Sequence, residues 1–589
     1  MTGLEVPTGS IVIRMGRLSV KLSAIPLSET QADSIEKGSR CFCEDNLANV
    51  NIIANPTTMT FEDILVKING FGRFQVMIVL IQCVSRVTLP AHFLLNNFIA
   101  AVPPHHCAVD WLAVNAFRNL TAQQTQTVSI PLEADGEPSS CLMFSEPHFH
   151  LLYNNSSEIN TTDLPAEPCQ NGWVFDNSTF KSTLATEWDL VCQDKGMNQV
   201  TATVFFIGVM MGAPVFGLLS DRFGRRPVLL VAYLSTLIFS TASAFSLSYI
   251  MYMVMRLLTG FTLSGISIIS VVLSVEWFGT EHRTFAGIIV SLDCTVGNLL
   301  LAGVAYLVND WRWLTIAVTS PLFLSVALWW WLPESARWLI ANGKTEQAHV
   351  YLQRCAVMNK CKADFTPETL ADAVIGDQHR KYTIVDLMRT PNIRKLAICT
   401  GIVWFGVAFT YYGISLNMTG FGQSIYLKQF IYASIEVPGK IGVFYLVKMI
   451  GRRPVEVGTL LLTGACLLIN IFVPQGLWVV RTVVGVLGKG LSEAAFTILF
   501  LYTTELYPTV VRQTGIGYTS FLARMGVAVA PLVILLEDVW KLLPSIVFCA
   551  VSVLAGLVTC LLPETRDVPL PEFIDDIEET RYCCAVQKK

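Results

Sequence analysis

The sequence predicts an all-α protein that crosses a membrane many times. Of its 589 residues, 52% are hydrophobic and only 15% are charged, and the mean hydropathy is +0.51. A soluble chain carries about 25% charged residues. Many apolar runs also approach or exceed the roughly 20 residues that a membrane-spanning helix needs. These runs are continuous rather than alternating, which argues against a β-barrel.

Twelve apolar segments are long enough to be predicted as membrane-spanning helices. The eighth is the weakest prediction, because it contains Glu436, Pro438 and Lys440. The segments lie at 76–101, 200–219, 228–245, 249–275, 286–308, 313–332, 396–416, 430–447, 455–473, 478–500, 515–536 and 544–562.

Lys and Arg predict the orientation of these spans. They gather in "DRFGRRP" after the second span, in "KMIGRRP" after the eighth, and between the sixth and seventh. Positive residues stay in the cytoplasm, so we expect both termini there. The expected parts are an N-terminal extension (1–60), a first half (61–332) with an extracellular loop (102–198), a linker (333–395), a second half (396–562) and a tail (563–589).

The long loop after the first span has two features of an extracellular segment. Its N-x-S/T sequons predict glycosylation at Asn119, Asn154, Asn155, Asn160 and Asn177. Its four cysteines are Cys107, Cys141, Cys169 and Cys192. An even set in an oxidising compartment predicts two disulfides, and the sequence leaves three pairings open.

The two halves of the chain repeat each other. "DRFGRRPVLL" at 221–230 matches "KMIGRRPVEV" at 448–457, and "PESAR" from Pro333 matches "PETR" from Pro563. Six spans return the chain to its starting side, so both copies have the same orientation. Such a parallel repeat resembles the major facilitator superfamily, with twelve helices in two six-helix halves around a midplane site. The competing class is a channel, but no re-entrant selectivity filter is evident.

Motifs along the chain resemble solute carrier family 22, the organic ion transporters, over about residues 61–566. They are "GFGRFQ" at 70–75, "EWDLVC" at 187–192, "LSDRFGRRPVLL" at 219–230, "DWRWL" at 310–314, "PESARWL" at 333–339 and "ELYPTVVRQTGIG" at 505–517. Segments 404–417 and 488–509 are similar to the organic anion branch. The resemblance implies a plasma-membrane carrier. Its members commonly begin just before "FEDIL", which Met59 would suit, so residues 1–58 are expected to be an extension.

Charged loop residues are expected to form gates. The resemblance implies latches that open and close during alternating access, and the simpler interpretation is that Arg only keeps this side in the cytoplasm. The expected gating residues are Asp221, Arg222, Arg225, Arg226, Glu276, Arg283, Arg452, Arg453, Glu505 and Arg512.

Lys440 and Arg524 are cations inside predicted spans. Ionisable residues at this depth face a protein interior or water, and two cations there favour anions. The resemblance implies that both recognise the anion, where Arg can form a bidentate fork. The alternatives are internal pairs: Glu436 lies one turn before Lys440, and Asp293 in the fifth span could reach Arg524 across the bundle.

Aromatic and amide side chains complete the expected substrate site. Apolar walls with a few polar groups are typical of small-molecule pockets, although packing against lipid or another helix is the alternative. The expected residues are Trp404, Tyr411, Tyr412, Phe496, Phe500, Asn97 and Asn298.

Together these features predict a carrier of small organic anions, by exchange or facilitated diffusion. The expected partners are carboxylates, including prostaglandins, cyclic nucleotides, urate or dicarboxylate counter-anions, and the lipid bilayer, but no nucleic acid. We expect that the protein is not an enzyme and binds no cofactor or metal. The segment "GVLGKGLS" at 485–492 lacks the spacing of a phosphate-binding loop, and the eight histidines form no metal-ligand pattern. The alternatives are a cation or zwitterion carrier, or a non-transporting receptor, on the same fold.

Overall fold

The computed structural model divides the chain into two compact units, Met1–Thr57 and Thr58–Lys589, which are considered separately. The described residues are 10–15, 18–23 and 61–578, except 69, 110–119, 134–136, 153–163, 280–281, 362–365, 369, 371–383, 417–423, 475, 509, 567, 569–570, 572–573 and 576.

The first unit contains a β-hairpin. Strands β1 (Ser10–Met15) and β2 (Leu18–Ser23) pair antiparallel, with Ser10 opposite Ser23. Both strands are rich in Val, Ile and Leu, residues that suit a strand. We expected only a polar extension here, so the hairpin was not predicted.

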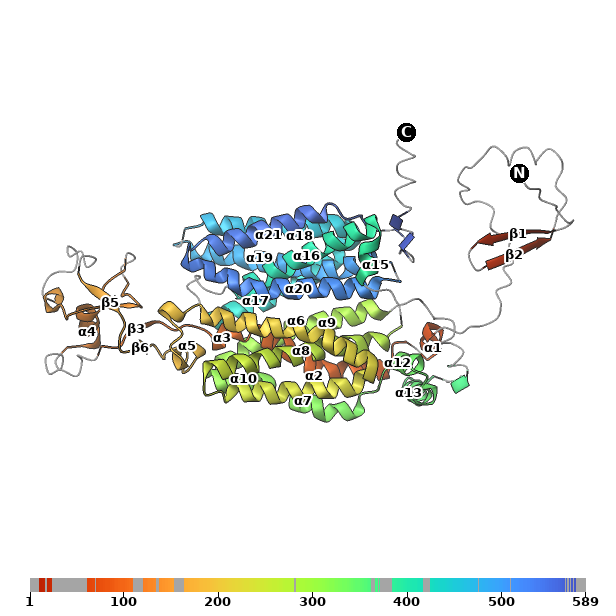
Figure 1. Cartoon of the computed structure of the whole chain (residues 1–589), viewed down its shortest axis with the longest axis horizontal. Coiled ribbons are helices and arrows are strands. Elements are labelled where there is room, and N and C mark those ends of the chain that lie inside the picture. The colour runs from red at the N-terminus through yellow and green to blue at the C-terminus, as the bar shows by residue number, and fades with distance from the viewer. Residues whose placement is uncertain are drawn as a thin grey trace, which may run out of the picture. The chain divides into compact units, whose positions relative to one another are not determined.

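The second unit is built from two helical bundles, shown in Figure 1 with the first in orange to green and the second in cyan to blue. The first bundle consists of α1 (Phe61–Lys67), α2 (Arg73–Leu94), α3 (Asn96–Ile99), α6 (Met197–Phe223), α7 (Arg225–Ala244), α8 (Tyr249–Glu276), α9 (Arg283–Leu307), α10 (Trp311–Thr319), α11 (Pro321–Leu328) and the 3-10 turn η7 (Trp329–Trp331).

The second bundle consists of α16 (Pro391–Leu416), α17 (Ile425–Met449), α18 (Arg452–Phe472), α19 (Trp478–Leu506), α20 (Arg512–Ile534), the 3-10 turn η8 (Leu535–Asp538) and α21 (Leu543–Thr559). Helix α6 packs against α20, and α9 packs against α17, so the bundles meet along these pairs. Between the bundles, the chain forms α12 (Ala336–Ala341), α13 (Thr345–Met358) and α15 (Ile384–Arg389).

The helices confirm the prediction of an all-α membrane protein. Among the described residues, 10 helices are long and apolar enough to span a membrane, and Ser291–Leu307 and Leu543–Thr559 are shorter apolar helices. The uncertain eighth span is one helix, α17, which continues through Pro438. Outward faces carry exposed apolar side chains such as Leu218 and Phe472, as lipid contact requires.

The second unit also contains a lobe of short elements between α3 and α6 (Figure 1). Strand β3 (His105–Cys107) pairs with β6 (Trp173–Phe175), and β4 (Leu142–Phe144) pairs with β5 (Ala166–Pro168), both antiparallel. The other elements are α4 (Ala122–Ser129), η3 (Phe149–Leu152), α5 (Leu184–Glu187) and η5 (Cys192–Asp194). We call the end of the bundles next to residues 100–196 the loop end.

The opposite end carries two glycine turns, and we call it the turn end. Gly224 joins α6 to α7 with φ of 103°, and Gly451 joins α17 to α18 with φ of 113°. A Cβ atom would lie 2.6 Å from a carboxylate oxygen of Glu334 at Gly224, and 2.9 Å from Glu564 at Gly451. Both the positive φ and the close carboxylate therefore require glycine.

Candidate functional site

A cluster of four charged side chains lies in the second bundle, formed by Glu436 and Lys440 of α17 with Lys489 and Glu493 of α19. Lys440 Nζ lies 3.0 Å from Glu493 Oε1 and 3.9 Å from Glu436 Oε2, and Lys489 Nζ lies 3.4 Å from Glu436 Oε1. No side chain of the four is more than 9% exposed. With two acids and two lysines, this four-charge cluster has no net charge when all four are ionised.

Helix α9 of the first bundle contacts the same cluster. Lys440 donates to the carbonyl of Ser291 at 2.8 Å and to Thr295 Oγ1 at 2.7 Å, while Thr295 donates to Glu436 at 3.0 Å. The Asn298 amide lies 3.5 Å from Glu436. The four-charge cluster therefore joins the two bundles, and the Asn298 side chain is engaged by Glu436 of this cluster.

Helix α16 covers the other side of the cluster. Tyr411 donates to Glu436 at 3.0 Å, and Lys489 lies 3.2 Å from the centre of the Tyr411 ring. Lys489 also donates to Ser415 Oγ at 2.8 Å. Of the two interpretations of Lys440, these contacts favour internal pairing.

Sequence reasoning missed Lys489 and Glu493. Both lie inside the predicted span 478–500, and the lysine was considered only as part of a phosphate loop. Their depth in an apolar segment was the signal that could have identified them, because intramembrane charges are usually functional or paired.

Asp293 does not pair with Arg524. Its Oδ2 instead accepts from Arg86 Nε of α2 at 2.7 Å, and both side chains are buried. Arg86 also donates to Gln82 at 3.1 Å and to Ser274 at 3.2 Å. The proposed bridge across the bundle was therefore wrong: a nearer cation in the first span, overlooked in the sequence, holds this carboxylate.

Arg524 makes no ion pair with any residue that the structure describes. It lies midway along α20 and is half-buried. In the described structure its one hydrogen bond is a long one of 3.5 Å to the carbonyl of Val209 on α6. A guanidinium has five donors, so most of its hydrogen-bonding capacity remains for another group.

Aromatic rings from both bundles meet between α6 and α16, and both of these helices pack against α20, which carries Arg524. The Tyr412 ring lies 5.3 Å from Phe206 of α6 and 6.3 Å from Phe93 of α2, measured between ring centres. Phe93 lies 5.9 Å from both Phe205 and Phe206. Phe93, Phe205 and Phe206 were not predicted, because a sequence does not show which of many aromatic residues face each other.

The remaining predicted aromatic residues divide into two groups. Trp404 donates to Thr503 at 2.8 Å and packs 5.5 Å from Phe496, which also lies 5.6 Å from Tyr411. Phe500 is 51% exposed and makes no ring contact among the described side chains. Phe496 thus belongs to the wall near the four-charge cluster, whereas Phe500 does not.

Asn97 of α3 donates to the carbonyl of Ser415 at 2.9 Å and so joins the bundles.

Arg256 of α8, in the first bundle, also has no ion pair with any described residue. It is 1% exposed, and its guanidinium lies 4.4 Å from the centre of the Phe205 ring. Its Nε and Nη1 atoms have no hydrogen-bond partner in the described structure. The Arg256 guanidinium therefore lies against Phe205, one of the rings of this aromatic group.

Three of the predicted gate residues of the first bundle form one group of ion pairs at the turn end, which we call a latch. Arg225 pairs with Asp221 at 2.9 Å and with Glu276 at 3.1 Å, which links α6, α7 and α8. Glu334 accepts from the backbone N–H of Arg225 at 3.0 Å and of Arg226 at 3.1 Å, and thereby caps α7.

The second bundle repeats this latch with different residues. Arg452 pairs with Glu505 at 2.9 Å, and Glu564 accepts from the backbone N–H of Arg452 at 2.9 Å and of Arg453 at 3.0 Å. The sequence analysis did not single out Glu334 and Glu564 as contacts of these clusters, although the repeated "PES" and "PET" motifs contain them. Burial raises the pKa of Glu334. Burial also opposes ionisation of Glu564, but hydrogen bonds from four backbone N–H groups outweigh it and lower that pKa.

Four other predicted gate residues play different roles. Arg222 lies over Phe223, and Arg226 lies 4.3 Å from the Trp329 ring centre. Arg453 donates to the carbonyl of Cys560, and Arg512 donates to that of Tyr507 at 3.2 Å. The side chain of Arg283 lies outside the described part of the chain.

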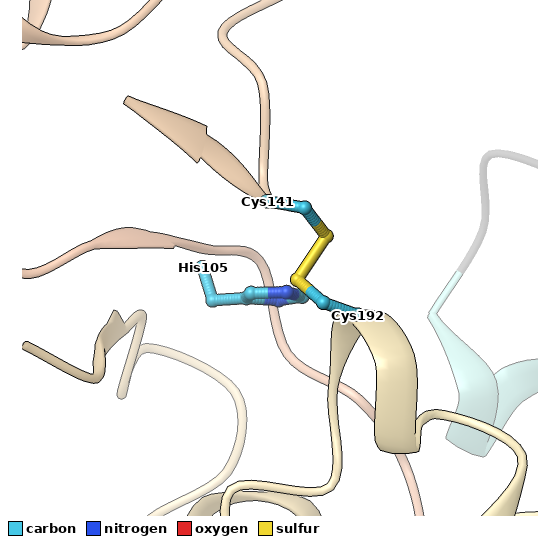
Figure 2. A group of neighbouring side chains, drawn as sticks. All are labelled: His105, Cys141 and Cys192. Carbon is cyan, nitrogen blue, oxygen red and sulfur yellow. A yellow bond between two sulfur atoms is a disulfide. The ribbon is translucent and has the colours of Figure 1, made fainter. Parts of the chain in front are cut away.

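The loop of the first bundle contains two disulfides, Cys107–Cys169 and Cys141–Cys192, which selects one of the three open pairings. The ring of His105 lies against the second disulfide (Figure 2). Because the two sulfur atoms are bonded to each other, this group is not a thiolate metal site. Asn177 is exposed, and the other predicted glycosylation sites, Asn119, Asn154, Asn155 and Asn160, lie outside the described residues.

Comparisons with known proteins agree with this architecture. The family described as "Sugar (and other) transporter" matches residues 154–576. Solute carrier family 22 member 7 of Mus musculus is 45% identical over 530 residues, which cover 88% of this chain and 97% of that protein. The Homo sapiens member 7 is 44% identical over 90% of this chain and 98% of that protein.

Solute carrier family 22 member 6-B of Xenopus laevis is 39% identical over 88% of this chain and 95% of that protein. Among solved structures, the inward open xylose transporter XylE from E. coli superposes with a TM-score of 0.57 and 14% identity, covering 86% of this chain and 99% of that one. At this identity the likeness shows the fold alone, which is that of the major facilitator superfamily.

Proposed function

Since the chain belongs to solute carrier family 22, a family of multi-pass membrane transporters rather than enzymes, we propose that it carries small organic anions across the plasma membrane by alternating access. The observation that carries this proposal is the charge at Arg524. An arginine in a span, with no acid beside it among the described residues, favours an anion as its partner.

The charge balance around Arg524 supports the same conclusion. The acids of the four-charge cluster are matched by Lys440 and Lys489, and Asp293 is matched by Arg86. No described acid in this region is therefore left to attract a cation. An organic cation carrier would need such an acid, so this alternative is less favoured.

The geometry supports a division of roles within the site. Arg524 would hold the carboxylate through two parallel N–H···O bonds. The rings of Tyr412, Phe206 and Phe93 would pack against the apolar part of the anion. In this proposal Lys440 stays in the four-charge cluster and positions α17 against α9, and it does not contact the anion.

Alternating access requires two bundles that move as units. The latches at Arg225 and Arg452 tie helices within one bundle each. The hydrogen bonds and ion pairs described between the bundles lie near the middle of the helices or at the loop end. In the proposed cycle the loop end, with its disulfides and exposed Asn177, faces outside and is closed in this structure.

The proposed substrates are carboxylates and related anions, which include prostaglandins, cyclic nucleotides and urate. The relatives named above are identified as members 6 and 7 of the same solute carrier family. Uptake would proceed by facilitated diffusion or by exchange, with a dicarboxylate as counter-anion. Preloading cells with dicarboxylate tests for exchange, which it should accelerate.

Uptake measurements test the proposal. Cells that express the chain are given a panel of radiolabelled organic anions and one quaternary amine, with surface delivery measured by biotinylation. We expect anion uptake that Arg524→Ala strongly reduces. Preferential uptake of the amine, or anion uptake that Arg524→Ala leaves unchanged, would contradict the assignment, and no flux at all would favour a receptor.

A further inference from the structure

Tyr426 lies at a joint between the two bundles at the loop end. It belongs to the first turn of α17, and its ring meets three aromatic rings of the first bundle and its loop. The ring centres lie 5.7 Å from Phe98 of α3, 5.9 Å from Phe180 of the loop and 5.7 Å from Tyr306 of α9. The Phe98 ring is stacked on Tyr426 with an interplanar angle of 13°.

The Tyr426 hydroxyl adds polar contacts to the same surface. It donates to the carbonyl of Thr179 at 3.4 Å and lies 3.4 Å from the side-chain amide of Asn309. One side chain of the second bundle is thus held by three separate segments of the first. We call Phe98, Phe180 and Tyr306 the aromatic seat of Tyr426.

The part of the loop that contributes to the aromatic seat is fixed to the first bundle. Lys181 donates through its backbone N–H to the carbonyl of Asn309 at 3.0 Å, and Trp311 donates in the same way to Ser182 at 3.2 Å. Phe180 therefore moves with the first bundle, and separation of the bundles at this end must withdraw Tyr426 from its seat.

An exposed ion pair between the bundles at this end contributes less. Lys195 Nζ lies 3.3 Å from Asp538 Oδ1, but the side chains are 55% and 57% exposed. Solvent and salt screen such pairs, which contribute little. The packed rings are therefore a larger barrier to opening than this ion pair.

We propose that Tyr426 and its aromatic seat form the latch that closes the loop end, and that Phe180 makes the disulfide-bonded loop a working part of this gate. The inference rests on the proposed alternating access, but it does not depend on which ion is carried. Opening breaks the ring contacts and the Thr179 bond together, so the latch sets how often the central site is accessible from outside.

Native Cys294 provides a probe for opening. It is a free, half-buried thiol on α9, next to Asp293 and one residue before Thr295, which contacts the four-charge cluster. A membrane-impermeant trimethylammonium methanethiosulfonate is added outside intact cells. The rate at which it modifies Cys294 is measured on surface-biotinylated protein, and Cys294→Ser gives the background.

Tyr426→Ala and Phe180→Ala are expected to speed the modification of Cys294 roughly tenfold, because each removes ring contacts that hold the closed state. Tyr426→Phe keeps the rings and is expected to change the rate less than about twofold. The matched control, Lys195→Ala, disrupts only the exposed pair and is expected to leave the rate unchanged.

An unchanged rate in both alanine variants would overturn the proposal, as would an equal acceleration in Lys195→Ala. If Tyr426→Ala does not reach the surface, Phe180→Ala decides alone. The labelling needs no substrate, so it tests the closure at Tyr426 separately from the proposed function. If Tyr426→Ala and Phe180→Ala are labelled at the parental rate but Arg524→Ala loses anion uptake, the closure at Tyr426 is refuted and anion transport is still supported.

Discussion

Replacement of Glu493 by Gln tests whether Lys440 is held inside the protein or free to bind an anion. The substitution removes the nearest acid of Lys440, 3.0 Å away, and leaves only Glu436 at 3.9 Å. At an effective dielectric constant of about 20, the Lys440–Glu493 attraction is about 5.5 kcal/mol before desolvation. Loss of one partner of a buried pair typically costs about 3–5 kcal/mol, because the other charge remains buried.

This cost translates into a measurable change in thermal stability. Unfolding entropy is about 2.1 cal/mol/K per residue, or about 1 kcal/mol per degree for a chain of roughly 500 residues. Glu493→Gln and Lys440→Met should each lower Tm by about 3–5 °C. In the double variant neither charge is left unpaired, so most of the loss should be recovered.

A double-mutant cycle on detergent-purified protein measures the coupling between the two side chains. Losses that add to within about 0.5 kcal/mol would refute the pairing. Lys195→Met with Asp538→Asn is the matched control, since that pair is exposed and should show almost no coupling. If Lys440 only holds the cluster, the double variant should also retain uptake, and loss of uptake at normal surface density would contradict this role.

Three further results are expected. The first concerns Glu456 of α18, which is fully buried and whose carboxylate oxygens have no partner in the described structure. Because the internal repeat aligns it with the equally buried Leu229, Glu456→Leu should stabilise the protein by about 1–3 kcal/mol. A lower Tm in this variant would show that the carboxyl is needed. Glu564 has a lowered pKa, so its stabilisation is present above the ordinary Glu pKa and is lost as pH falls through the folded value; the Tm difference between parent and Glu564→Gln should grow as pH rises. Glu334 has a raised pKa, so the Tm difference between the parent and Glu334→Gln should shrink as pH rises. If the Tm difference changed with pH in the same way for both variants, these cap assignments would be contradicted.

The sequence was sufficient to predict the helices, because long apolar runs and turn glycines act locally. Span eight was uncertain owing to Glu436, Pro438 and Lys440, yet α17 is continuous. Its charges are matched by side chains on α19, whose proximity is a property of the fold and not of the span itself. The break between α10 and α11 was missed, since the run that contains Ser320 and Pro321 is still apolar enough overall for a membrane span.

The site could be predicted only in part for the same reason. Arg524 was evident as a charge inside a span, and its lack of a described acidic partner is consistent with that expectation. The partner of Asp293 could not be chosen, because Arg86 and Arg524 are both far from it in sequence and only packing brings Arg86 within 2.7 Å. Likewise, helical spacing grouped Phe496 with Phe500 but did not show that Phe206 of the other bundle meets Tyr412.

The most direct test of anion binding by Arg524 compares a carboxylate substrate with its neutral methyl ester or amide in competition for uptake. If Arg524 forms a bidentate pair with the carboxylate, Arg524→Gln should raise the Ki of the anion about 100-fold, as expected for loss of a charge-assisted pair, and leave that of the neutral analogue nearly unchanged. Residual uptake of the same radiolabelled anion, normalised to surface density, provides the readout. An equal loss of affinity for both compounds, or none for the anion, would contradict the assignment of anion recognition to Arg524.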